Sequence, residues 1–190
     1  MASEKIILGV DPGTQIMGYG IIAVKGQRFR LIHLDYAKFT YKDSPILRLK
    51  QIFEATSKVI EEYLPDEMAV EAPFFGKNVQ SMLKLGRAQG VVMAAALSKG
   101  IPVEEYSPRK VKQSITGKGS ASKEQVYAML ERNFSEKIEA KYLDSSDALA
   151  VALCHHYQSS NPTLSKLGKA NSWEQFLKQN PNRKAWSSPH

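Results

Sequence analysis

The chain has little cysteine and no long apolar run. One cysteine among 190 residues allows no disulfide within the chain, which excludes a disulfide-stapled fold and fits a reducing cytosol. No stretch is apolar over the roughly 20 residues that a membrane-spanning helix needs, and the N-terminus lacks the basic-then-apolar pattern of a signal peptide. We therefore expect a soluble cytoplasmic protein with no membrane partner.

Acidic residues are scarce relative to basic ones: 19 Asp and Glu stand against 26 Lys and Arg, a formal net charge of +7. This balance favours an acidic partner, most often nucleic acid, although charge alone leaves ribosomal, membrane-surface and housekeeping roles open. With 43% apolar residues the chain can bury one good core. We predict one domain over residues 1–158 and a basic, flexible tail over 159–190, where Ser, Asn, Pro and Lys replace apolar residues.

The order of apolar patterns predicts an α/β fold. The expected strands are Lys5–Val10, Met17–Val24, Arg28–Phe39, Met68–Glu71 and Pro102–Tyr106. The expected helices run from Pro45 to before Pro65, over Val79–Lys99, from Pro108 through Lys112, from a capping box at Ser122, and over Asp144–His156. Three antiparallel strands followed by strands that alternate with helices indicate a mixed five-stranded central sheet flanked by helices.

The first expected strand ends on a carboxylate, Asp11, and a tight Pro12-Gly13 turn follows it. A charged Asp at the mouth of an apolar strand costs desolvation energy unless it is paired or holds a cation. Three other interpretations compete on this motif alone: an Asx-turn stabiliser, a phosphate-loop residue of an ATPase, and a simple turn former.

Three more carboxylates stand at comparable places. Glu71 also ends an apolar strand, and Asp144 and Asp147 fall in the first turn of the last helix, where residues three apart share a face. Each has a structural alternative, because Glu71 could pair with a basic side chain and the two Asp residues could cap the helix. Clustered carboxylates would raise one another's pKa unless cations neutralise them. Together they predict Mg²⁺ ligands, and two such ions roughly 3.5–4 Å apart would hydrolyse a phosphodiester.

Several motifs closely resemble the RuvC family of Holliday-junction resolvases, over about Ile6 to His156. They are Asp11-Pro12-Gly13-Thr14 with Gly18-Tyr19-Gly20, Glu71 followed by Phe74 and Lys77-Asn78, Leu85-Gly86-Arg87-Ala88-Gln89-Gly90, and Asp144-Ser145-Ser146-Asp147-Ala148-Leu149-Ala150. The resemblance implies a ribonuclease-H-like fold and a homodimeric, Mg²⁺-dependent endonuclease that cuts four-way DNA junctions symmetrically on two strands in recombination and repair. It assigns Asp11, Glu71, Asp144 and Asp147 as metal ligands and catalytic residues. It further implies a bacterial, nucleoid-associated enzyme with a branch-migration motor as partner.

The resemblance also suggests DNA-binding residues. Phe74 matches an aromatic that stacks on an unpaired base near the crossover, although Phe74 or Phe75 could instead fill the core. Lys112 and Lys123 match basic positions near the scissile phosphate, and Lys77 and Lys118 complete the predicted DNA-binding set. From the residues alone, Lys112 and Lys123 are ordinary solvated lysines.

Three expectations concern the helices. Helix Val79–Lys99 carries more apolar surface than one sheet face needs, and the family pairs its subunits there, so we predict a two-fold dimer interface. His155 and His156 lie too far from Asp144 to share a metal, and we expect them at the surface. Cys154 is expected to be a buried apolar residue rather than a nucleophile.

Other functions fit the sequence less well. An actin-like kinase or chaperone would need a second phosphate loop and twice this length, a nuclease of ribosomal RNA precursors should lack the Phe74 loop, and a non-catalytic DNA-binding module would have no use for four carboxylates.

Overall fold

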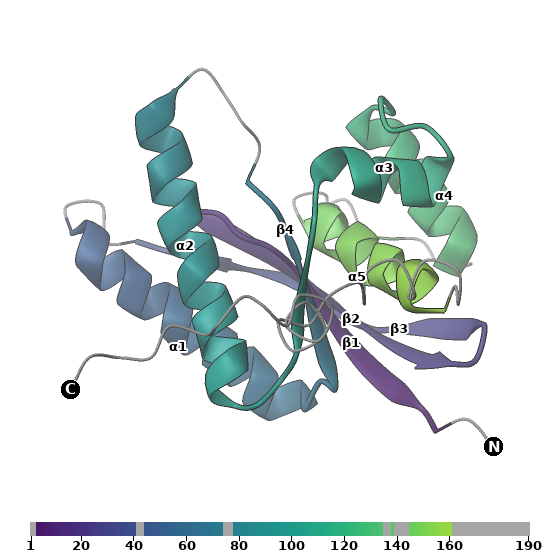
Figure 1. The fold of residues 1–190 in the computed structure, drawn as a ribbon, viewed down its shortest axis with the longest axis horizontal. Helices are drawn as coiled ribbons and strands as arrows, with labels where there is room; N and C mark the ends of the chain where they lie inside the picture. Colours follow the sequence, from purple (N-terminus) through teal and green to yellow (C-terminus); the bar gives the residue numbers. More distant parts are fainter. Residues whose placement is uncertain (1–2, 41–43, 74–77, 135–137, 139–144, 161–190) are drawn as a thin grey trace, which may run out of the picture. The chain divides into compact units, whose positions relative to one another are not determined.

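A mixed five-stranded sheet forms the centre of the fold (Figure 1). The computed structural model describes residues 3–40, 44–73, 78–134, 138 and 145–160. The strands are β1 (Lys5–Asp11), β2 (Ile16–Lys25), β3 (Arg28–Lys38), β4 (Glu67–Glu71) and β5 (Val103–Tyr106), in the order β3-β2-β1-β4-β5. Strands β1, β2 and β3 pair antiparallel, whereas β4 pairs parallel with both β1 and β5. The predicted fold class is therefore confirmed.

Within the described residues, five helices cover the two faces of the sheet, as Figure 1 shows. They are α1 (Pro45–Tyr63), α2 (Val79–Ser98), α3 (Pro108–Thr116), α4 (Lys123–Phe134) and α5 (Ser146–Ser159). Helices α1 and α2 pack on one face through Leu8, Val10 and Met68 of the sheet. Helices α3, α4 and α5 pack on the other face, where the sheet contributes Ile7, Ile22 and Ala69. This division follows from the two-residue period of strands, which sends successive side chains to opposite faces.

Local signals set the helix starts. The Ser44 hydroxyl accepts from the Leu47 N–H at 3.2 Å and begins α1. The predicted capping box at the start of α4 is present, because Ser122 and Gln125 exchange side-chain-to-backbone hydrogen bonds of 2.9 and 3.3 Å. The β2–β3 turn also forms as expected, with Gly26 at φ +62°.

Two predicted helix boundaries were wrong. Helix α3 continues past Lys112 to Thr116 because it buries Val111 and Ile115 on one face and meets no breaker before Gly117, which takes φ +77°. Helix α5 runs to Ser159 rather than ending at His156, since nothing in Tyr157 or Gln158 stops it. Asp144, its predicted first residue, lies outside the described residues.

Helix α5 is buried on all sides, and this overturns the expectation that His155 and His156 lie at the surface. They are 4% and 2% exposed, respectively. The helix lies between the sheet and the α3–α4 pair, and every residue from Ala148 to Cys154 is buried, as in a helix that is apolar all round. The prediction that Cys154 is buried is confirmed.

Contacts divide the chain into a unit Met1–Tyr157 and a unit Gln158–His190. Residues 161–190 lie outside the described part, so the tail stays a prediction. Within the described residues, we find no helix with the length and apolar character needed to cross a bilayer.

Candidate active site

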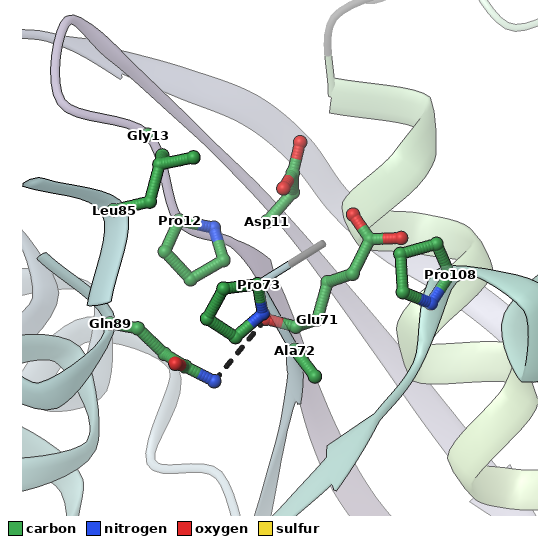
Figure 2. A pocket seen from close by; sticks show the side chains of 9 residues that line it. All are labelled: Asp11, Pro12, Gly13, Glu71, Ala72, Pro73, Leu85, Gln89 and Pro108. Carbon is green, nitrogen blue, oxygen red and sulfur yellow. Dashed lines mark hydrogen bonds between the residues drawn. The ribbon is translucent and has the colours of Figure 1, made fainter. Parts of the chain in front are cut away.

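Asp11 and Glu71 end neighbouring parallel strands. The register pairs Val10 with Val70, so the next step along each strand brings Asp11 level with Glu71, on strands about 4.8 Å apart. Val10 and Val70 face the α1–α2 side, and the residues that follow them therefore face α5. The sequence prediction that these two carboxylates meet at one edge of the sheet is confirmed by this geometry (Figure 2).

A close approach of α5 to the sheet brings in Asp147. Gly9 and Gly20 are paired across β1 and β2 and leave room for α5. A Cβ on Gly9 would lie 2.2 Å from the Ala148 oxygen, and one on Gly20 would lie 3.0 Å from the Leu149 Cα. The helix backbone thus rests almost directly on the sheet, and Asp147 in its first turn reaches the region of Asp11 and Glu71.

The electrostatics of Glu71 show that these carboxylates interact. Burial raises the pKa of Glu71, the negative charges of Asp11 and Asp147 raise it further, and the pKa reaches about 8. Lys112, on α3, lies close enough to oppose this rise. An anionic cluster whose members disfavour one another's ionisation is stabilised by a cation, and all-oxygen ligands suit a hard divalent ion.

The described carboxylates make an incomplete metal site. Within residues 3–40, 44–73, 78–134, 138 and 145–160, no group of three Asp, Glu, His or Cys side chains is arranged to hold a metal ion. The fourth predicted ligand, Asp144, lies outside these residues. The donor chemistry and the raised pKa of Glu71 nonetheless fit a divalent cation at this place.

The predicted lysines occupy different environments. The Lys123 ammonium lies 3.0 Å from a carboxylate oxygen of Asp147, and half-buried Lys112 acts on Glu71. Both positions therefore adjoin the carboxylates and are not isolated surface lysines. Lys118 is exposed between α3 and α4, whereas Phe74 and Lys77 lie outside the described residues.

A cleft of about 330 Å³ opens beside Asp11 and Glu71 (Figure 2). Its other lining residues are Pro12, Gly13, Ala72, Pro73, Leu85, Gln89 and Pro108. Sequence reasoning quoted Gln89 only as part of the Leu85–Gly90 motif and gave it no role. It is 7% exposed on α2 and donates to the Glu71 carbonyl at 3.4 Å and to Glu105 at 2.8 Å. A polar residue among the buried Ala and Val positions of α2 was the signal that could have found it.

The strand order of the sheet is that of a ribonuclease-H-like fold. Carboxylates lie at the adjacent ends of β1 and β4, and a third lies on the helix packed across them, which is the arrangement of a nuclease-type site. The family model "Crossover junction endodeoxyribonuclease RuvC" matches residues 7–155. The chain therefore belongs to the RuvC family of crossover junction endodeoxyribonucleases.

Individual relatives agree with this assignment. The chain is 54% identical over 180 residues to the crossover junction endodeoxyribonuclease RuvC of Cytophaga hutchinsonii, covering 95% of this chain and 88% of that protein. The Porphyromonas gingivalis protein of the same name is 51% identical over 183 residues, covering 95% and 97%. The structure of T. thermophilus RuvC in complex with Holliday junction substrate superposes with a TM-score of 0.74 at 33% identity, covering 82% of this chain and 95% of that one.

Proposed function

We propose that this chain is a homodimeric, Mg²⁺-dependent endonuclease that resolves four-way DNA junctions by symmetric cuts in two strands. The observation that carries the proposal is the mutual electrostatic effect of Asp11, Glu71 and Asp147 at one edge of the sheet. Related proteins are named as crossover junction endodeoxyribonucleases, and one related structure holds a Holliday junction.

The chemistry assigns a role to each group. Asp11, Glu71, Asp147 and the predicted ligand Asp144 would hold divalent cations, two per site. Such ions activate water as a nucleophile and stabilise the leaving oxygen of a phosphodiester. Lys112 and Lys123 would balance the charge of the carboxylates and of the incoming phosphate. The cleft beside Asp11 and Glu71 gives the strand being cut a place against Pro12 and Pro73.

Base stacking by Phe74 and phosphate contacts by Lys77 and Lys118 stay predictions of the same proposal. So do the branch-migration partner and the association with the nucleoid.

A nicking assay tests the proposed activity. Purified protein receives a four-way junction, a linear duplex or a structured RNA, with Mg²⁺ or with chelator. We expect paired nicks in the junction alone, and only with Mg²⁺. Equal cutting of the duplex, or cutting that resists chelation, would refute the proposal. Asp11→Asn should abolish cutting while junction binding persists, and an equal loss of binding would make Asp11 a structural residue.

Helix α2 offers a surface for the proposed dimer. Its exposed side carries a stripe of apolar and small residues, which are Val79, Leu83, Gly86, Gly90, Ala94 and Leu97. Their spacing of three or four residues keeps them on one helix face. A Cβ on Gly86 or Gly90 would meet nothing within 4 Å, so a second helix could approach closely.

The mass in solution tests the dimer. Leu83 is 53% exposed, and Leu83→Glu should convert a dimer into a folded monomer in sedimentation velocity. As a control, Ile46→Glu changes a residue on α1 that is 78% exposed and should leave the dimer intact. A wild-type protein that sediments as a monomer at micromolar concentration would contradict the proposal.

A further inference from the structure

His155 is a buried polar residue that the proposed chemistry does not use. It lies on α5, and its side chain is 6% exposed. Its Nδ1 lies 2.8 Å from the Tyr106 hydroxyl, and its Nε2 lies 2.8 Å from a Glu67 carboxylate oxygen. A neutral imidazole with its proton on Nε2 satisfies both contacts, because the tyrosine donates to Nδ1 and Nε2–H donates to the carboxylate.

The hydrogen bonds of His155 continue into a chain that we call the rear network, formed by Lys5, Glu67, His155 and Tyr106. The Lys5 ammonium donates to Glu67 at 2.6 Å. Burial alone would raise the pKa of Glu67, but hydrogen bonds from Lys5 and His155 outweigh it and hold the pKa below its usual value. The rear network therefore joins β1, β4, β5 and α5 through an ionised carboxylate.

Lys5, Glu67 and His155 of the rear network lie behind the carboxylates on the same elements, whereas Tyr106 ends β5, where its backbone pairs with Glu71, and its hydroxyl extends to His155. Lys5 begins β1 and Asp11 ends it, while Glu67 begins β4 and Glu71 ends it. Four steps along β4 span about 13 Å at roughly 3.3 Å per residue. Eight steps along α5, from His155 back to Asp147, span about 12 Å at roughly 1.5 Å per residue. The strand and the helix thus cover nearly equal lengths between the rear network and the active site.

Besides His155, α5 contacts the strands through apolar side chains and through a hydrogen bond between His156 and the Gln27 backbone in the β2–β3 turn. Ala148, Leu149, Ala152 and Leu153 are fully buried, and burial of apolar surface is non-directional. A hydrogen-bonded imidazole, by contrast, fixes both the rotation of the helix and its position along the sheet, because its geometry is narrow.

We propose that His155 is a positioning residue, which holds α5 through Glu67 and Tyr106 so that Asp147 meets Asp11 and Glu71 at the spacing that a divalent cation needs. The inference rests on the proposed function, since it concerns the same carboxylates. His155 acts about 12 Å away from Asp147 and contacts neither metal nor DNA.

Adjacent His156 provides a matched control. It is equally buried on the same helix, but it packs against Phe29 and Tyr157, and its hydrogen bond leads to the Gln27 backbone in the β2–β3 turn rather than to Glu67 on β4. His155→Leu and His156→Leu remove the same ring from neighbouring positions, so a general loss of stability should affect both. His155→Gln keeps a donor that can reach Glu67 and serves as the conservative variant.

The experiment measures Mn²⁺ binding by electron paramagnetic resonance without DNA, and junction cutting in Mg²⁺, at a temperature where circular dichroism shows all variants folded. His155→Leu should weaken Mn²⁺ binding about tenfold and lower kcat by about tenfold to a hundredfold with KM within twofold. On a logarithmic scale, His155→Gln should recover at least half of the Mn²⁺ affinity and of the kcat that His155→Leu loses. His156→Leu should match wild type in both.

Two results would overturn the role of His155: wild-type Mn²⁺ affinity in His155→Leu, or equal losses in the two leucine variants. A wild-type protein that binds Mn²⁺ but cuts no junction would refute the proposed function instead, and the Mn²⁺ comparison would still decide whether His155 positions the carboxylates.

Discussion

The contact between α5 and the sheet at Gly9 can be tested by adding a single methyl group. In Gly9→Ala the new Cβ would lie 2.2 Å from the Ala148 oxygen and 2.6 Å from the Ala152 nitrogen, where ordinary contacts begin at 3.4 Å. Both atoms belong to the helix backbone and cannot rotate away. Helix α5 would therefore have to retreat by roughly 1 Å, which sacrifices a quarter to a half of the dispersion energy along its contact with the sheet.

The expected cost is large for a Gly-to-Ala change. Overpacking of this kind costs about 1–3 kcal/mol or more, and we expect about 3 kcal/mol, or roughly 6–12 °C in Tm for a domain of this size. Because α5 carries Asp147, a shift of about 1 Å should also lower junction cutting by roughly 100-fold. Gly20→Ala is the graded comparison: its Cβ would lie 3.0 Å from Leu149 Cα, and we expect about 1 kcal/mol.

Urea unfolding followed by circular dichroism gives the two free energies, and nicking at 20 °C gives the activities. An alanine normally stabilises a strand relative to glycine, by roughly 0.5–1 kcal/mol. A Gly9→Ala protein that is as stable as wild type, or more stable than Gly20→Ala, would therefore refute the close approach of α5.

Three further predictions follow from the site and from α4. The pKa of Glu71 is raised from 4.5 to about 8. Its contribution to the free energy of unfolding is therefore complete below pH 4.5 and is lost as pH rises through 8. Metal-free Glu71→Gln should lack this pH dependence. At pH 9 the variant should have a free energy of unfolding in urea about 2 kcal/mol above that of wild type. The rise of the pKa from 4.5 to about 8 sets an upper bound of about 5 kcal/mol on this gain. The expected gain is smaller because the buried amide also loses solvation. Lys123→Met should lower cutting by at least about tenfold yet change stability by under about 0.5 kcal/mol, since the pair with Asp147 is partly exposed. Lys118→Met, which removes a predicted phosphate contact, should raise KM for the junction and leave kcat near wild type. Ser122→Ala should cost about 1 kcal/mol in thermal unfolding through loss of the capping box, and an unchanged Tm would contradict that role.

The parts of the fold that local signals determine were predictable. Apolar strands ending on Asp11 and Glu71, and the serines that begin helices, depend on residues close together in the sequence. The surroundings of His155 did not follow, because a histidine after an apolar run has no local mark of burial, and only the α3–α4 pair that covers α5 buries it. Gln89, on α2, was given no role for the same reason, since its partner Glu105 lies on a different element, β5.

The site holds groups that oppose folding, and the rest of the fold must offset them. Bringing Glu71 beside Asp11 and Asp147 disfavours the charged form that a metal requires. The compensating elements act on α5 and β4: glycines that admit the helix backbone, a buried apolar run over Ala148–Cys154 of the helix, and an ionised Glu67 held by Lys5 and His155. Because these elements stabilise the arrangement without contacting DNA, a weakened contact among them should lower both stability and metal affinity. A change confined to the carboxylates, such as Glu71→Gln, should instead raise the stability of the metal-free protein above about pH 8 while it removes activity. The two directions distinguish residues that support the site from residues that form it.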